Sequence, residues 1–140
     1  MVRLRHRLRV VEALVLVLLA RVLRRHVPMR RWSALLGPTG PARTAPVLGR
    51  LDGAEVRVAV ALRSAAARTG ANCLEQAVAA SVMMRVRRRP GVVVVGLDAR
   101  RPDAVPHAWF VGASGLVVTG EDVMDGFRPA SQFGPLSSRP

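Results

Sequence analysis

Apolar side chains recur at the spacing of one helix face between residues 70 and 88. The members of this face are Leu74, Ala77, Val78 and Val82. Asn72 comes just before them and is a favourable N-cap, and Glu75 follows three residues later, close to a capping-box arrangement. The pattern therefore predicts a helix that begins at Cys73 and buries one face. Pro90 and Gly91 end it.

Two further segments have helical periodicity. Residues 54–68 predict a helix with a face of small and β-branched side chains, formed by Val56, Ala59, Val60, Ala66 and Ala67. Residues 1–32 are basic at both ends and contain an uninterrupted apolar run at 13–20, which predicts a helix packed on the domain. Residues 37–49 between these two segments are rich in Gly and Pro and predict a loop.

Short apolar runs follow the helix that begins at Cys73. Residues 92–97 are mostly β-branched and predict a strand buried on both faces, and residues 107–112 and 116–119 predict two more strands around a turn at 113–115. A helix followed by an antiparallel meander is an α+β arrangement. Residues 127–140 predict a packed Phe127, a second packed position at Phe133 and a fraying tail.

The pattern divides the chain into four parts. Residues 1–36 form a basic and apolar helical segment, 37–50 a Gly/Pro linker, 51–134 the core and 135–140 a flexible tail. The apolar run at 13–20 is too short to cross a bilayer, which needs about 20 apolar residues. Arginines rather than a small-residue cleavage site follow the run, which argues against an export signal. Contact with a membrane surface through this helix is the alternative to packing on the domain.

Composition limits the chemistry. The single cysteine excludes an internal disulfide and fits a reducing, cytoplasmic compartment. The three histidines and the cysteine have no metal-ligand spacing, so we expect neither a metal nor a cofactor. All 22 basic residues are arginine and the net charge is +13, which attracts acidic partners. The basic run at 85–89 fits a solvated helix end and a binding patch equally well.

Cys73 and His107 form the candidate catalytic pair. In the first turn of a helix, free N–H groups and the helix dipole favour a thiolate over a thiol. His107 lies 34 residues downstream in an extended apolar context, followed by Ala108 and Trp109, whereas His6 and His26 lie among arginines. A thiolate that faces an imidazole on a neighbouring strand is the arrangement of a cysteine hydrolase.

These motifs resemble a known family. Asn72-Cys73-Leu74 opening a helix, then a strand, then His107-Ala108-Trp109 and a hairpin, is similar to the transglutaminase-like leader peptidases of lasso-peptide biosynthesis. The resemblance covers about residues 56–133, and the N-terminal helix is also similar to what precedes the domain in that family. It implies a papain-like cysteine protease that removes the leader from a ribosomally made precursor peptide, with Cys73 as nucleophile and His107 as base.

The resemblance also implies partners. A separate PqqD-like recognition protein captures the leader, and a separate ATP-dependent cyclase closes the ring. The apolar run at 13–20 and the helix at 54–68 are the expected surfaces for docking the recognition protein. No nucleic acid is expected, since aromatic residues are 4% of the chain and no stacking platform is evident, although a basic nucleic-acid binder remains the non-catalytic alternative.

The third catalytic residue departs from the family pattern. In the family an acid stands on the strand after the histidine strand, but residues 116–119 contain no carboxylate and Thr119 takes about that position. Asp122 is our first choice for the residue that orients His107, with Glu121 and Thr119 as substitutes, and a main-chain carbonyl is the further alternative. Hydrolysis and amide-forming acyl transfer remain open at the same site, since no residue discriminates them.

Overall fold

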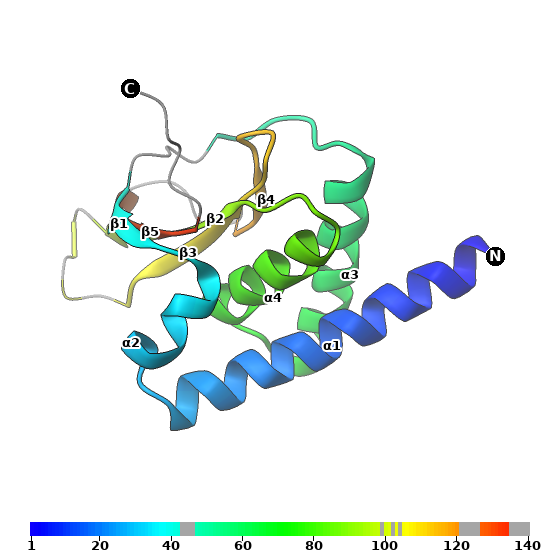
Figure 1. Cartoon of the computed structure of the whole chain (residues 1–140), viewed down its shortest axis with the longest axis horizontal. Helices are drawn as coiled ribbons and strands as arrows, with labels where there is room; N and C mark the ends of the chain where they lie inside the picture. Colours follow the sequence, from blue (N-terminus) through cyan, green and yellow to red (C-terminus); the bar gives the residue numbers. More distant parts are fainter. Residues whose placement is uncertain (43–46, 99, 102, 104, 121–126, 135–140) are drawn as a thin grey trace.

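The computed structural model describes residues 1–42, 47–98, 100–101, 103, 105–120 and 127–134 of the 140-residue chain. Helices cover one face of a five-stranded antiparallel sheet (Figure 1), which confirms the predicted α+β class. The helices are α1 (Val2–His26), α2 (Met29–Trp32), α3 (Gly53–Thr69) and α4 (Cys73–Val86), with a 3-10 turn at Ser33–Leu36. The strands are β1 (Thr39–Pro41), β2 (Val92–Asp98), β3 (His107–Val111), β4 (Val117–Thr119) and β5 (Phe127–Phe133).

The central helix is α4. The side chain of Asn72 accepts a hydrogen bond from the Glu75 backbone N–H, and the Glu75 carboxylate accepts one from the Asn72 N–H, so the predicted start at Cys73 is confirmed. The prediction of a single buried face was wrong, because α4 lies between the sheet and α1 and also contacts α3 (Figure 1). Its fully buried side chains therefore surround it: Ala77, Ala79, Ala80, Met83 and Met84.

The predicted packing of the N-terminal helix on the domain is confirmed. One face of α1 enters the main core through Val10, Ala13, Val17 and Ala20. The Arg87 guanidinium donates to both carboxylate oxygens of Glu12, at 2.9 and 2.8 Å, and so links α4 to α1. In the basic run at 85–89, Arg89 pairs with Asp52 and Arg85 donates to the Leu35 carbonyl. These arginines therefore connect elements of the fold. No helix in the described part of the chain is long and apolar enough to span a membrane.

The buried face of α3 matches the predicted one only in part: Ala59 is buried as predicted, but the two predicted valines are not. Val56 and Val60 are 42% and 41% exposed, whereas Val58 and Leu62 are fully buried. Apolar residues occur on both sides of this helix, so their spacing alone permits two faces. Glu55 selects between them, because it closes a capping box with Asp52 and its buried carboxylate accepts a hydrogen bond from the Ser114 hydroxyl at 2.8 Å.

The sheet has the strand order β1-β5-β2-β3-β4. The predicted meander corresponds to β2, β3 and β4, and two other strands were missed. One is β5, which pairs with β2 and β1 where only packed phenylalanines were expected; the other is β1, in the predicted loop at 37–49. Pro129 and Ser131 in β5, and Gly40 and Pro41 in β1, have low strand propensity, so pairing with neighbouring strands forms these two elements. Residues 135–140, predicted as a tail, lie outside the described residues.

Strand β2 is buried on both faces, as predicted. Val93 joins the main core beneath the helices, while Val92 and Val94 join a second apolar cluster with Trp109 of β3 on the other face. Because both clusters include residues of β3, the start of that strand has a fixed position. His107 is the first residue of β3.

Candidate active site

Cys73 and His107 line one cleft of about 250 Å³. Cys73 is the first residue of α4, and His107 begins β3, which packs against α4. The other residues of the cleft are Arg24, Met29, Asn72, Leu74, Val95, Val105, Pro106 and Ala108. The wall is mainly apolar, with Arg24 as its charged member, so the cleft can take an extended peptide segment with an apolar side chain.

The environment of Cys73 favours its thiolate. Burial raises the pKa of the thiol, but hydrogen bonds from the His107 side chain and from the backbone N–H groups of Ala108 and Leu74 outweigh it, so the pKa lies below its ordinary value. The N-terminus of α4 adds the positive end of the helix dipole. The sulfur is half-buried and free of any disulfide. These conditions are those of a reactive cysteine.

A main-chain carbonyl orients the imidazole of His107. The Nε2 atom lies 3.0 Å from the carbonyl oxygen of Gly120, the residue that follows β4. A carbonyl oxygen only accepts hydrogen bonds, so Nε2 carries the proton and donates. This contact fixes the tautomer and leaves Nδ1 as the ring nitrogen that is available to the thiol of Cys73.

Only glycine fits at residue 120. Its φ is +92°, in the left-handed region. A Cβ atom there would lie 2.7 Å from the Ala108 carbonyl oxygen and 3.3 Å from Nε2 of His107. A side chain would therefore push the loop away from the imidazole. Sequence reasoning missed this residue, and the only signal in the sequence is a glycine directly after the strand that follows the histidine strand.

Two aromatic rings pack against the imidazole of His107. The indole of Trp109 meets the imidazole edge-to-face with 4.8 Å between ring centroids, and the ring of Phe127 lies 5.3 Å away. Gly96 on β2 makes room for the indole, since a Cβ there would lie 2.5 Å from it. The His-Ala-Trp motif thus places the histidine and a ring that packs against it on the same face of β3, two residues apart.

The three residues predicted as orienters have different outcomes. Asp122 and Glu121 lie outside the described residues. Thr119 is buried opposite Phe110 in the ladder between β3 and β4, and its hydroxyl makes no hydrogen bond with any described residue, His107 included. The side chain of Gln76, one turn after Cys73, donates to the Ala71 carbonyl at 3.0 Å, and Gln76 does not line the cleft. The backbone N–H of Cys73 remains the candidate oxyanion donor.

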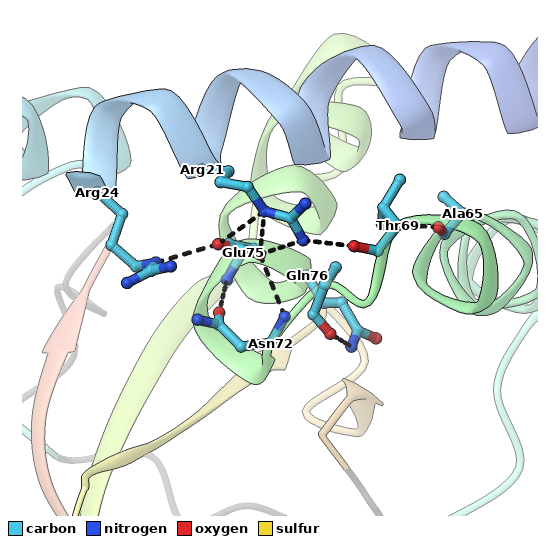
Figure 2. A network of polar contacts seen from close by, with 8 residues as sticks. Arg21, Arg24, Ala65, Thr69, Asn72, Glu75 and Gln76 are labelled. Carbon is cyan, nitrogen blue, oxygen red and sulfur yellow. Dashed lines mark hydrogen bonds and ion pairs between the residues drawn. The ribbon is translucent and has the colours of Figure 1, made fainter. Parts of the chain in front are cut away.

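A buried carboxylate links α1 to the start of α4. The Glu75 side chain accepts hydrogen bonds from Arg21 at 3.2 Å and from Arg24 at 3.0 Å, and Arg21 also donates to the Thr69 carbonyl (Figure 2). The same carboxylate caps the Asn72 N–H beside Cys73. Two arginines of α1 therefore support the residue that fixes the helix start. Sequence reasoning predicted the Glu75 cap but not these partners, which lie about 50 residues away in the sequence.

The other histidines lie apart from the cleft. His6 is half-buried and His26 is exposed, both on α1. No group of three or more His, Cys, Asp or Glu side chains in the described ranges could hold a metal ion.

Cys73 lies at the start of a helix, and this helix packs on a small antiparallel sheet that carries His107. This is a papain-like arrangement of a cysteine and a histidine. A family model described as Transglutaminase-like superfamily matches residues 13–132. The chain belongs to this superfamily. The match begins within α1, so the family region includes most of the N-terminal helix. No significant match was found among curated proteins or among solved structures.

Proposed function

We propose that this chain is a cysteine peptidase that removes the leader from a ribosomally synthesised lasso-peptide precursor. The observation that supports the proposal most is the lowered pKa of the Cys73 thiol beside His107 in an open cleft. Membership of the Transglutaminase-like superfamily supports cysteine-protease or acyl-transfer chemistry. The leader-peptide substrate rests on the resemblance of the motifs Asn72-Cys73-Leu74 and His107-Ala108-Trp109 to those of leader peptidases.

In the proposed reaction the Cys73 thiolate attacks the carbonyl carbon of the scissile peptide bond. The Cys73 N–H stabilises the oxyanion, and His107 gives the proton to the leaving amine as the C–N bond breaks. The resulting thioester is then hydrolysed by a water molecule that passes a proton to His107. The Gly120 carbonyl keeps Nε2 protonated during both steps, and Asp122 is the acid that we propose to assist it.

Cleavage is proposed to depend on partners in the cytoplasm. A PqqD-like recognition protein presents the leader, and an ATP-dependent cyclase uses the released core peptide. The expected result is slow cleavage by the isolated chain and a sharp increase when the recognition protein is added. Full-rate cleavage by the chain alone would contradict this dependence on a recognition protein.

The test is incubation of a precursor peptide with the protein, with and without the recognition protein, followed by mass spectrometry of the products. Hydrolysis leaves a free carboxyl group on the leader, whereas acyl transfer to an added amine leaves an amide, so the product masses distinguish the two reactions. His107→Ala should lower the rate nearly as far as Cys73→Ala, because nucleophile and base act as a unit and their losses do not add. A double variant much slower than either single variant would argue against a shared site.

A further inference from the structure

The α1 helix has a second apolar face that the domain does not cover. Its side chains are 46% to 62% exposed, and we call them the outward stripe: Leu4, Leu8, Val11, Val15, Leu18 and Val22. Successive members are four, three, four, three and four residues apart. This is the heptad spacing of a coiled-coil interface, in which apolar residues occupy positions a and d.

The stripe lies opposite the face that packs on the domain. With about 100° per residue in a helix, Val10, Ala13, Val17 and Ala20 fall on one side of α1 and the stripe on the other. Within the run at 13–20, a predicted docking surface, the side chains thus divide between the two faces. Residues 1–9 include no buried side chain, and this end of α1 extends beyond the other helices (Figure 1). The outward stripe is therefore accessible along most of the helix.

The shape of the stripe favours a helix as its partner. Leu19, which is 54% exposed, widens the apolar surface near the C-terminal end of α1, while the stripe itself keeps the a and d spacing of helices that pack together. Helices that lie on membranes commonly carry Trp or Phe as well as Leu on the apolar face, whereas the stripe consists of leucine and valine alone. Next to its C-terminal end, a groove of about 140 Å³ between α1 and the turn at Ser33–Leu36 is lined by apolar residues that include Leu19 and Leu35.

The N-terminal part of the stripe has positive charge on both flanks. Arg5 and Arg7 occupy the positions beside the N-terminal part of the stripe, and neither forms an ion pair with a described residue. The corresponding positions farther along α1 are Glu12, Leu14, Leu19 and Arg21. The first turn of α1 contains no acid, although the positive end of the helix dipole favours one there. Negative charge supplied from outside, beside Arg5 and Arg7, would interact favourably with this end of the helix.

A second copy of the chain is a poor occupant. Arginines lie near both ends of α1, so a parallel or an antiparallel pair of copies would bring like charges together. The net charge of +13 adds a general repulsion.

We propose that the outward stripe of α1 docks an amphipathic helix of a partner protein that has apolar residues at heptad spacing and acidic residues on both flanks where it faces the N-terminal part of α1. These acidic residues face Arg5 and Arg7, as residues at the e and g positions do in a coiled coil. This proposal does not depend on the reaction at Cys73.

The probe is a labelled synthetic helix of about four heptads with Leu at a and d and Glu at e and g. The chain should bind it, and added salt should weaken the complex. Leu8→Gln/Val15→Gln should weaken binding at least about 10-fold, which is about 1.4 kcal/mol. The matched control is Val47→Gln/Leu48→Gln, because these side chains are 52% and 58% exposed, as Val15 and Leu8 are 51% and 60%. The control should bind like the unmodified chain.

A charge-reversed variant tests the electrostatic part. Arg5→Glu/Arg7→Glu should weaken binding of the Glu helix and strengthen binding of a helix with Lys at e and g. The proposal is overturned if the Glu helix does not bind, or if the stripe and control variants bind it equally. It is also overturned if the stripe instead mediates binding to phosphatidylglycerol-containing vesicles, or a dimer in sedimentation that Leu8→Gln/Val15→Gln abolishes.

Discussion

At the residue scale, the candidate site has an uncharged orienter next to the imidazole. The Gly120 carbonyl fixes the proton on Nε2 of His107, and Trp109 and Phe127 pack around the ring. A carbonyl holds the tautomer but stabilises an imidazolium less than a carboxylate does. A cysteine enzyme tolerates this difference, because the pKa of its thiol is already lowered by donors and by the helix start.

Replacing Gly120 tests the orienting contact. Gly120→Ala adds a Cβ that lies 2.7 Å from the Ala108 carbonyl oxygen, so the Gly120 carbonyl must move away from Nε2. We expect at least about a 10-fold loss of cleavage, because a displaced base loses part of the roughly 10²- to 10⁴-fold that proton transfer contributes. Gly115→Ala is the matched control, because φ is +82° there and nothing lies within 4 Å. Both substitutions strain the backbone by about 1 kcal/mol, and equal effects on cleavage would contradict the orienting role.

The reactivity of Cys73 with pH is a second residue-scale prediction. Alkylation by iodoacetamide follows the thiolate, so its midpoint should lie below the ordinary thiol value of 9.0. His107→Gln removes the contribution of the imidazole and should move the midpoint upward. A midpoint that does not differ between the two proteins would show that His107 does not act on the thiol.

Substitutions of Asp122 and Thr119 are a third test at this scale. Because Gly120 already holds Nε2, Asp122→Asn should lower cleavage by less than the roughly 10⁴-fold seen when the carboxylate of a serine-protease triad is lost. Thr119→Ala should have a smaller effect, since the Thr119 hydroxyl makes no hydrogen bond with a described residue. A loss for Asp122→Asn as large as in the serine protease would make the carboxylate, and not the carbonyl, the main orienter.

At the scale of elements, α1 stabilises the start of α4 through Glu75. Glu75→Gln leaves Arg21 and Arg24 without their buried carboxylate and should lower the free energy of unfolding by about 2 kcal/mol, as expected for lost hydrogen bonds to a charged group. Glu12→Gln is the matched control, because its pair with Arg87 also joins α1 to α4 but is partly exposed. It should cost less than about 1 kcal/mol, and urea titration measures both.

The same pair predicts a dependence on pH. Burial raises the pKa of Glu75, but hydrogen bonds from Arg21 and Arg24 outweigh it and lower the pKa from an ordinary value of 4.5. A carboxyl group whose pKa is lowered by folding stabilises the protein above its unfolded pKa and loses this contribution as pH falls through the folded pKa. The stability difference between the unmodified chain and Glu75→Gln should therefore shrink below about pH 4.5. A difference that is constant down to strong acid would exclude the ionised pair as its cause.

Local signals in the sequence predicted some elements and missed others. The Asn72 cap and β-branched runs determine where α4, β2 and β3 begin, so the positions of Cys73 and His107 were predictable. The pairing of β5 between β1 and β2 comes from long-range contacts, and no local preference of Pro129 or Ser131 indicates it. A carbonyl has no side chain to identify it, so the role of Gly120 required the structure.

At the scale of the whole molecule, the helical layer and the sheet meet at the cleft. The cysteine comes from α4, the histidine from β3, and α1 contributes Arg24 to the cleft wall. The family match, which begins within α1, agrees with this shared architecture.

The central claim is that Cys73 is the nucleophile, and the most direct measurement is precursor cleavage by Cys73→Ala beside the unmodified chain. Each reaction contains the recognition protein, and thermal unfolding is recorded for both chains. Because a half-buried thiol contributes little to packing, we expect Cys73→Ala to keep the melting temperature of the unmodified chain and to show no detectable cleavage. Cleavage retained by a folded Cys73→Ala would contradict the account.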